Sequence, residues 1–152
     1  MLPPPDSSTT DDPVCLRLTE LFHGAPISRA LGMKLHYDSQ KRAVFDFPRN
    51  LSLDHALQDV HGGMIATLLD NAGWFTVAAH YNCWVVTVEF QTRLLEPANQ
   101  ENLRSIGQIL RVGKSLATAE MSVFGKSDRL VATGSGTFTV TKYSLETSLN
   151  AN

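Results

Sequence analysis

The sequence has little of three things that would narrow its class at once: cysteine, net charge and long apolar runs. Its two cysteines, Cys15 and Cys83, do not have the spacing of a metal site, so we expect reduced core residues in a cytoplasmic protein without disulfides. The formal net charge of −2 predicts neither a nucleic-acid nor a membrane partner. No apolar run approaches the roughly 20 residues of a membrane-spanning helix, and the first residues lack the basic and apolar regions of a secretory signal.

The length of 152 residues predicts one domain with a sizeable core. Residues 1–13 are rich in Pro, Ser, Thr and Asp, a composition that cannot build a core, and they are expected to form a flexible tail. Residues 143–152 are expected to form a polar C-terminal tail. The folded domain is therefore predicted over residues 14–142.

Hydrophobic periodicity divides this domain into helices and strands. A loose helical pattern covers residues 14–31 and is broken by Gly24 and Pro26. Alternating apolar residues predict a hairpin of two strands at about 33–37 and 43–47, and a long apolar helix follows over about 62–80. Four further strands are expected near 83–95, 102–112, 116–125 and 129–141. This order predicts an α+β fold in which an antiparallel sheet packs on a helix.

The long helix has almost no polar face. Between residues 64 and 79 its polar side chains are few: Thr67, Asp70, Asn71 and Thr76. A helix that is apolar nearly all round is buried on most sides. We therefore expect a curved sheet wrapped around a central helix, with a dimer completing its cover.

The start and the middle of this helix carry candidate chemistry. His61-Gly62-Gly63 opens it, and the first N–H groups of a helix have no intrahelical partner. The Gly62 N–H, assisted by the helix dipole and aimed at a carbonyl, would be half of an oxyanion hole. The alternative is a tight turn into the helix. Asp70 is expected either to be held by a neighbouring side chain or to act as a base or nucleophile beside a pocket.

Gly62 and Asp70 are too far apart to act together within one helix. Eight residues separate them, which corresponds to about 12 Å along a helix axis. Two copies of the helix running antiparallel across a two-fold axis would bring Gly62 of one chain near Asp70 of the other. A C2 dimer would then hold two equivalent sites at its interface.

Four stretches carry a family resemblance: "DVHGGMIATLLDNAGWF", "TVEFQTRLLEP", "RVGKSLATAEMSVF" and "RLVATGSGTFTV". They closely resemble the hotdog-fold acyl-CoA thioesterases, specifically the phenylacetic-acid-degradation (PaaI-like) type, over roughly residues 25–141. The motif His-Gly-Gly with an acid nine residues after the histidine is fairly specific. The resemblance implies a long helix wrapped by an antiparallel sheet, dimers that often pair into tetramers, and hydrolysis of an acyl- or aroyl-CoA thioester.

The resemblance also implies roles for individual residues. Gly62 would donate its N–H to the thioester carbonyl, and Asp70 would be the nucleophile or the general base that activates water. Thr87 matches a strand position where many members place a hydroxyl near the acid, although an ordinary strand threonine is the alternative. Many members have Asn or Gln where this chain has His55, a departure that leaves the positioning of water open. His61 is expected to shape the turn rather than to transfer protons.

Coenzyme A enters as part of the substrate, and no metal or redox cofactor is implied. Its phosphates need exposed cations, and the candidates are Arg111 and Lys114, followed by Arg93 and Arg129. Trp74 and Phe75 are large for this helix and are expected either to be core residues or to shorten the acyl tunnel. Two rival functions remain: a non-catalytic acyl-CoA-binding hotdog protein, and a hotdog dehydratase or hydratase.

Overall fold

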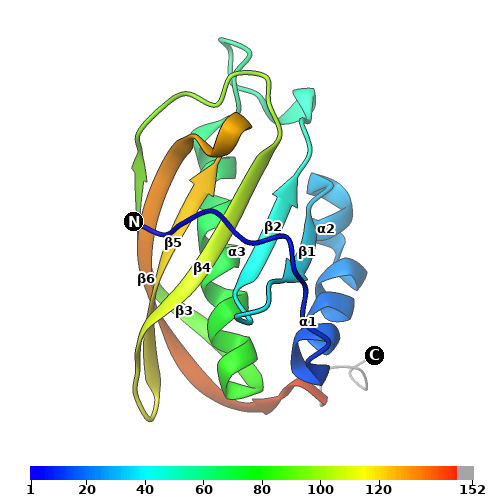
Figure 1. The fold of residues 1–152 in the computed structure, drawn as a ribbon, viewed down its shortest axis with the longest axis vertical. Helices are drawn as coiled ribbons and strands as arrows, with labels where there is room; N and C mark the ends of the chain where they lie inside the picture. The colour runs from blue at the N-terminus through cyan, green and yellow to red at the C-terminus, as the bar shows by residue number, and fades with distance from the viewer. Residues whose placement is uncertain (147–152) are drawn as a thin grey trace.

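The protein, described by a computed structural model over residues 1–146, is built on one antiparallel sheet of six strands. The strands lie in the order β1-β2-β4-β5-β6-β3 (Figure 1). Their bounds are Lys34–Tyr37 (β1), Ala43–Phe47 (β2), Cys83–Leu94 (β3), Leu103–Val112 (β4), Leu116–Phe124 (β5) and Leu130–Ser144 (β6). All six strands that the alternation predicts are therefore present, and the hotdog α+β fold is confirmed.

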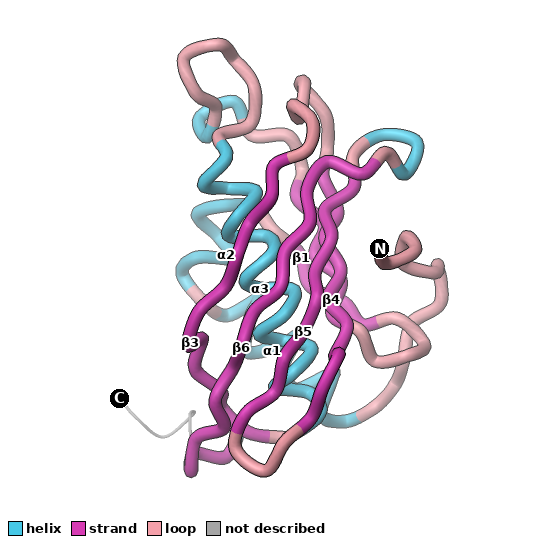
Figure 2. The backbone as a smooth tube through the Cα atoms, turned by 90° about the vertical axis from the view of Figure 1, so that its left-hand side faces the viewer, coloured by secondary structure: helices cyan, strands magenta, loops and turns pink. Residues whose placement is uncertain are grey.

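The helix α3 (Gly62–Tyr81) runs along one face of this sheet (Figure 2). It begins where the sequence predicts, because the His61 ring accepts a hydrogen bond from the Gly63 N–H at 2.9 Å and caps the first turn. It ends at Asn82, which adopts a left-handed conformation at φ 51°. Buried residues of α3 include Leu68, Leu69 and Ala72, all fully enclosed.

The approach of α3 to the sheet is close enough to need a glycine. A Cβ atom on Gly107 of β4 would lie 2.2 Å from the Ala72 carbonyl oxygen. Side chains then bond the two layers: the Ser105 hydroxyl donates to the Leu68 carbonyl at 3.0 Å, and the Thr76 hydroxyl accepts from the Ala43 N–H at 3.0 Å. The polar Thr76 inside the apolar helix is thus part of the helix–sheet contact.

Two short helices precede the sheet, as the broken helical pattern predicts. They are α1 (Pro13–Gly24) and α2 (Pro26–Leu31), and short 3-10 turns follow at Leu51–Leu53 and Lys126–Asp128. Asp12 caps α1 by accepting from the N–H groups of Val14 and Cys15. The Phe22 ring of α1 packs edge-on against Phe45 of β2 at 4.9 Å and so joins the core on the α3 side of the sheet.

The N-terminal segment differs from the expected free tail. Residues 1–12 have no helix or strand, yet they cross the sheet on the face opposite α3 (Figures 1 and 2). Leu2 is 3% exposed and packs with Val44, Ile106 and Phe124. A Pro- and Ser-rich composition does not reveal one leucine that fills an apolar gap, so the expectation that this segment contributes nothing to the core was wrong.

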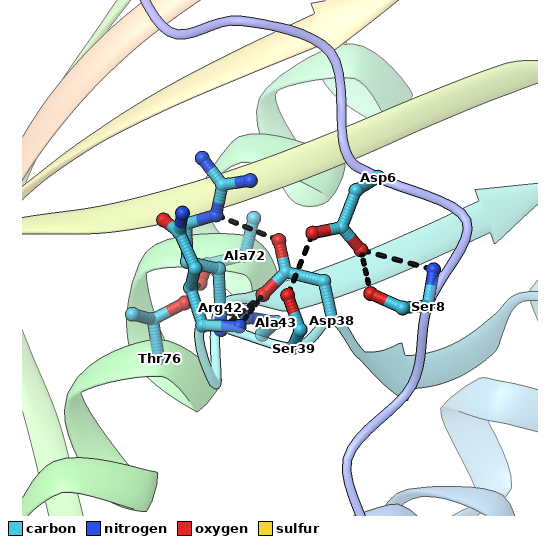
Figure 3. Close-up of polar contacts among 9 residues, drawn as sticks. Asp6, Ser8, Asp38, Ser39, Arg42, Ala43, Ala72 and Thr76 are labelled. Carbon is cyan, nitrogen blue, oxygen red and sulfur yellow. Dashed lines mark hydrogen bonds and ion pairs between the residues drawn. The ribbon is translucent and has the colours of Figure 1, made fainter.

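Polar contacts fasten the same segment to the turn between β1 and β2 (Figure 3). Asp6 accepts from the Ser39 hydroxyl at 2.7 Å, and Asp12 forms an ion pair with Lys41. The turn itself is held by Asp38, fully buried, which accepts from the Arg42 guanidinium at 2.7 Å. The buried charges are therefore paired, as burial requires.

The C-terminal boundary also differs. β6 continues to Ser144 and Leu145 is 1% exposed, so the packed chain extends beyond the expected end at residue 142. Residues 147–152 of the expected tail lie outside the described part.

The two cysteines are free thiols, with Cys15 buried and Cys83 half-buried. Within residues 1–146, no helix has the length and apolar character needed to cross a membrane.

Candidate active site

The centre of the candidate site is a carboxylate of α3 held by a hydroxyl of β3. The Thr87 Oγ1 donates a hydrogen bond to Asp70 Oδ1 at 2.9 Å. Burial raises the pKa of Asp70 above its ordinary value, and the Thr87 hydrogen bond partly offsets this rise. Asp70 is therefore a half-buried carboxyl group whose pKa is moved toward the range of a general base.

A second bond from α3 to β3 lies beside the first. The Trp74 indole N–H donates to the Val85 carbonyl at 2.9 Å. Four residues of a helix and two residues of a strand both advance by about 6–7 Å, so the Asp70–Thr87 and Trp74–Val85 bonds run side by side. This pair of bonds fixes the orientation of Asp70 and of the indole relative to the strand.

An apolar pocket of about 330 Å³ opens next to Asp70. Its wall holds four aromatic rings, other apolar side chains and three polar groups: Phe22, Trp74, Phe75, Trp84, Leu18, Leu21, Ala25, Ile27, Asp70, Asn71 and Thr87. An apolar cleft with a few convergent polar groups is the usual form of a small-molecule site. The helical pattern of residues 14–31 predicted the apolar face of α1, but the sequence did not indicate that this face covers Asp70.

A separate pocket of about 320 Å³ lies at the start of α3 and includes Gly62 and His55. No acceptor within residues 1–146 bonds the Gly62 N–H, so this donor remains available at the positive end of the helix dipole. A Cβ atom on Gly62 would lie 2.8 Å from Leu94 Cδ1. Because that atom is the end of a flexible and exposed side chain, a small shift of Leu94 would accommodate a Cβ, and packing alone does not require glycine at this position.

The surrounding loop fixes the ring of His55. Its Nδ1 accepts from the Leu57 N–H at 3.1 Å, so the ring proton of the neutral imidazole belongs on Nε2. Two backbone hydrogen bonds hold the loop around it: the Gln58 N–H donates to the His55 carbonyl at 2.8 Å, and the His55 N–H donates to the Asp59 carbonyl at 3.0 Å. An asparagine uses its side-chain oxygen in the same way to hold the N–H two residues on. Within the described residues, His55 thus combines a ring acceptor used by the loop with a ring donor that has no partner.

Within one chain, Asp70 and Gly62 line two different pockets. This agrees with the helical spacing, which places them about 12 Å apart. His61, next to Gly62, uses its ring nitrogen in the helix cap. The sequence-predicted residues therefore fall into two groups: Asp70 and Thr87 in one, and Gly62, His61 and His55 in the other.

The four candidate phosphate-binding cations are spread over the molecule. Arg111 and Lys114 are exposed at the turn between β4 and β5, and Arg93 is exposed on β3. Arg129 differs, because it forms ion pairs with Glu96 and Glu101. Its charge is already balanced by carboxylates, which makes it the poorest phosphate ligand of the four.

The Asp70 pocket is smaller than another cavity of the molecule. A larger cavity, of about 540 Å³, lies where β2 ends and β4 begins. Asp46 there is paired with His36 and Arg104, and the His36 hydrogen bond in particular lowers the pKa of this carboxyl. A fully paired carboxylate is a weak base, so chemistry favours the Asp70 pocket over the larger one.

A sequence model of the Thioesterase superfamily matches residues 57–132, which include His61, Gly62, Asp70 and Thr87. The chain belongs to this thioesterase superfamily. The matched region is half of the chain and runs from the loop before α3 into β6.

A curated relative agrees with this family assignment. A provisionally named esterase of Halobacterium salinarum is 35% identical over 92 residues, which are 54% of this chain and 60% of that protein. This thioesterase-superfamily chain therefore spans less than two thirds of the curated relative it matches.

Solved structures agree as well. A thioesterase-superfamily protein superposes with a TM-score of 0.79 at 27% identity, covering 84% of this chain and 98% of its own. The PaaI protein of the phenylacetic acid degradation operon of E. coli superposes with a TM-score of 0.77, covering 86% of this chain and 95% of its own. At 16% identity, that second likeness concerns the fold.

Proposed function

We propose that this protein is an acyl-CoA thioesterase that hydrolyses its substrate to a free acid and coenzyme A. The observation that carries the proposal is the Asp70–Thr87 hydrogen bond in the lining of an apolar pocket. Half-burial of a carboxylate costs solvation free energy, and a catalytic role on a bound ester accounts for this cost. The family named above supports the thioester as the bond that is cleaved.

In the proposed reaction, ionised Asp70 drives the attack on the thioester carbonyl carbon. As a base it takes a proton from water while the hydroxide oxygen bonds to that carbon; as a nucleophile it bonds to the carbon itself, and water later cleaves the anhydride. In both routes the C–S bond breaks, and the sulfur leaves with the electron pair and is protonated to the thiol. The free Gly62 N–H donates to the carbonyl oxygen as negative charge develops on it.

His55 is proposed to supply a second donor to the same oxygen or to the attacking water. Its Nδ1 is occupied by the Leu57 N–H, so Nε2–H is the group left for the pocket that it shares with Gly62. This gives histidine the role for which many relatives use an amide side chain. Histidine in place of the amide residue would then still donate the hydrogen bond.

The complete site is proposed to form between two protomers. β3 is an edge strand of 12 residues, and it leaves Val86 53%, Val88 57% and Phe90 37% exposed. A long apolar edge is a template for pairing with another strand. Pairing with β3 of a second copy would run the two α3 helices antiparallel and bring Gly62 and His55 of one protomer toward Asp70 of its partner. Arg111, Lys114 and Arg93 are the proposed contacts for the coenzyme A phosphates.

A heterodimer of two inactive variants tests the roles of Asp70 and His55 and also tests whether each site takes residues from both protomers. We expect Asp70→Asn and His55→Phe each to lose most thioesterase activity as homodimers, measured with acyl-CoAs and a thiol reagent. Coexpression with two different tags isolates the heterodimer. One of its two sites combines the intact Asp70 of one chain with the intact His55 of the other, so the purified heterodimer should recover about half of the wild-type rate.

Sites contained within single chains would give no recovery in the heterodimer, because each chain then carries one defect. Wild-type protein that cleaves no acyl-CoA would overturn the proposed activity. A folded protein that binds coenzyme A thioesters without cleaving them would instead be a non-catalytic binding protein.

A further inference from the structure

We infer that Trp74 limits acyl size at this site, so that the protein accepts a short chain or a single ring and rejects a long chain. The inference rests on the proposed thioesterase function and adds its substrate class. Trp74 lies one helical turn beyond Asp70, about 6 Å along the axis. Both residues line the pocket of about 330 Å³, so an acyl group whose carbonyl meets Asp70 soon meets the indole.

The indole is held in place on several sides. Its N–H donates to the Val85 carbonyl at 2.9 Å, which uses the one polar atom of the ring. The Trp74 ring packs against Phe75 at 4.7 Å and against Trp84 at 5.3 Å. A side chain fixed by a hydrogen bond and by neighbouring rings cannot swing aside to lengthen the pocket without breaking these contacts.

The Trp74 ring is supported by aromatic residues of the core. The Phe75 ring packs edge-on against Phe22 and Phe45, each at 5.4 Å, and Phe45 is fully buried. Close-packed interiors resist displacement, because moving one ring opens a gap or creates an overlap at the next. The end of the pocket is therefore backed by the same aromatic cluster that joins α1, β2 and α3.

The position of the Trp74 ring limits the length of the acyl group, and the modest volume of the pocket agrees with a small one. A volume of about 330 Å³ lies at the small end of the roughly 300–1,000 Å³ found for ligand sites. In an apolar pocket, one methylene too many or too few changes kcat/KM by about 10–200-fold. Several methylenes beyond the wall would accordingly exclude a long chain almost completely.

The test measures kcat/KM for butyryl-, benzoyl- and decanoyl-CoA with the wild type and three variants. For the wild type we expect butyryl- and benzoyl-CoA to exceed decanoyl-CoA by at least about 100-fold. Trp74→Ala should reduce this ratio by at least about tenfold. Trp74→Phe keeps a ring but loses the N–H and should reduce it less. Comparing ratios within each variant cancels any loss of folded enzyme.

Tyr81→Phe is the matched control for a disturbed helix. It removes the bond from the Tyr81 hydroxyl to the Gly113 carbonyl, 2.5 Å long, at the far end of α3 and should leave the ratio at the wild-type value. Equal kcat/KM for butyryl- and decanoyl-CoA in the wild type would overturn the inference. So would a Trp74→Ala protein that changes all three substrates in the same proportion.

Binding separates this inference from the proposed activity. The S-butyl and S-decyl thioethers of coenzyme A resist hydrolysis, and calorimetry gives their Kd values directly. Tighter binding of the butyl form by the wild type, lost in Trp74→Ala, supports the size limit even if no thioester is cleaved. Equal affinities for both thioethers contradict the size limit whatever the activity.

Discussion

The hydroxyl of Thr87 donates to the carboxylate of Asp70 across 2.9 Å and joins the edge strand β3 to the middle of α3. The bond stabilises the charged form of a carboxyl group whose pKa burial raises. Thr87 is thus placed to set the pH at which Asp70 becomes ionised. The strand that carries Thr87 also presents Val86, Val88 and Phe90 to solvent, the surface proposed for dimerisation.

Removal of the Thr87 hydroxyl should shift the pH dependence of the reaction. In Thr87→Val the hydrogen bond that lowers the pKa of Asp70 is lost, so this pKa rises further. The acidic limb of kcat/KM should therefore move to higher pH. Thr87→Ser keeps the hydroxyl and serves as the control, with the limb unchanged. Identical pH profiles for Val and Ser would show that Thr87 does not tune Asp70.

Asp70→Asn should be more stable than the wild type at neutral pH. The pKa of Asp70 is raised by folding, so its protonated form is favoured in the native state. The wild type therefore has its full stability below the ordinary pKa of an aspartate, and loses part of it as pH rises through the folded pKa. Asparagine does not ionise and avoids this loss.

The measurement for Asp70→Asn is Tm between pH 3 and pH 8, with the exposed Asp11→Asn as control. The advantage of Asp70→Asn over the wild type should be largest at the upper end and vanish toward pH 3. An advantage that is constant across the range would point to packing instead of charge.

Two substitutions of His55 should distinguish the contribution of its ring to activity from the contribution of its hydrogen bonds. Asparagine at this position can accept from the Leu57 N–H and still donate, so His55→Asn should keep activity within about tenfold of the wild type. His55→Phe keeps a ring without a donor and should lose about 10²–10³ in kcat, as for the removal of one oxyanion donor. If phenylalanine served as well as asparagine, the role would be steric.

Gly107→Ala should destabilise the contact between α3 and the sheet. The added Cβ would lie 2.2 Å from the Ala72 carbonyl oxygen, a backbone atom that cannot move freely. We expect the free energy of unfolding to fall by about 1–3 kcal/mol or more, measured by urea denaturation. Gly24→Ala is the matched control, because a Cβ there meets nothing within 4 Å, and its effect should stay below about 1 kcal/mol.

Much of this protein was determined by the sequence alone. Alternation of apolar residues predicted the strands, since burial on one face requires a period of two, and a long run with almost no polar face predicted α3 as a buried central helix. The motif from His61 to Gly63 marked the helix start, because a capping side chain and a glycine act on their immediate neighbours. Asp70 stood out because a carboxylate inside an apolar helix is costly.

Only the tertiary structure decided which residues meet across the fold. Leu2 in a gap on the sheet, α1 over the Asp70 pocket and the indole of Trp74 on the Val85 carbonyl are contacts between segments distant in the chain. The exposed apolar side chains of β3 were likewise invisible, because alternation predicts a strand but not whether it lies at an edge. Local pattern fixes the conformation of a segment, whereas its partners follow from how the whole chain packs and from which surfaces are left uncovered.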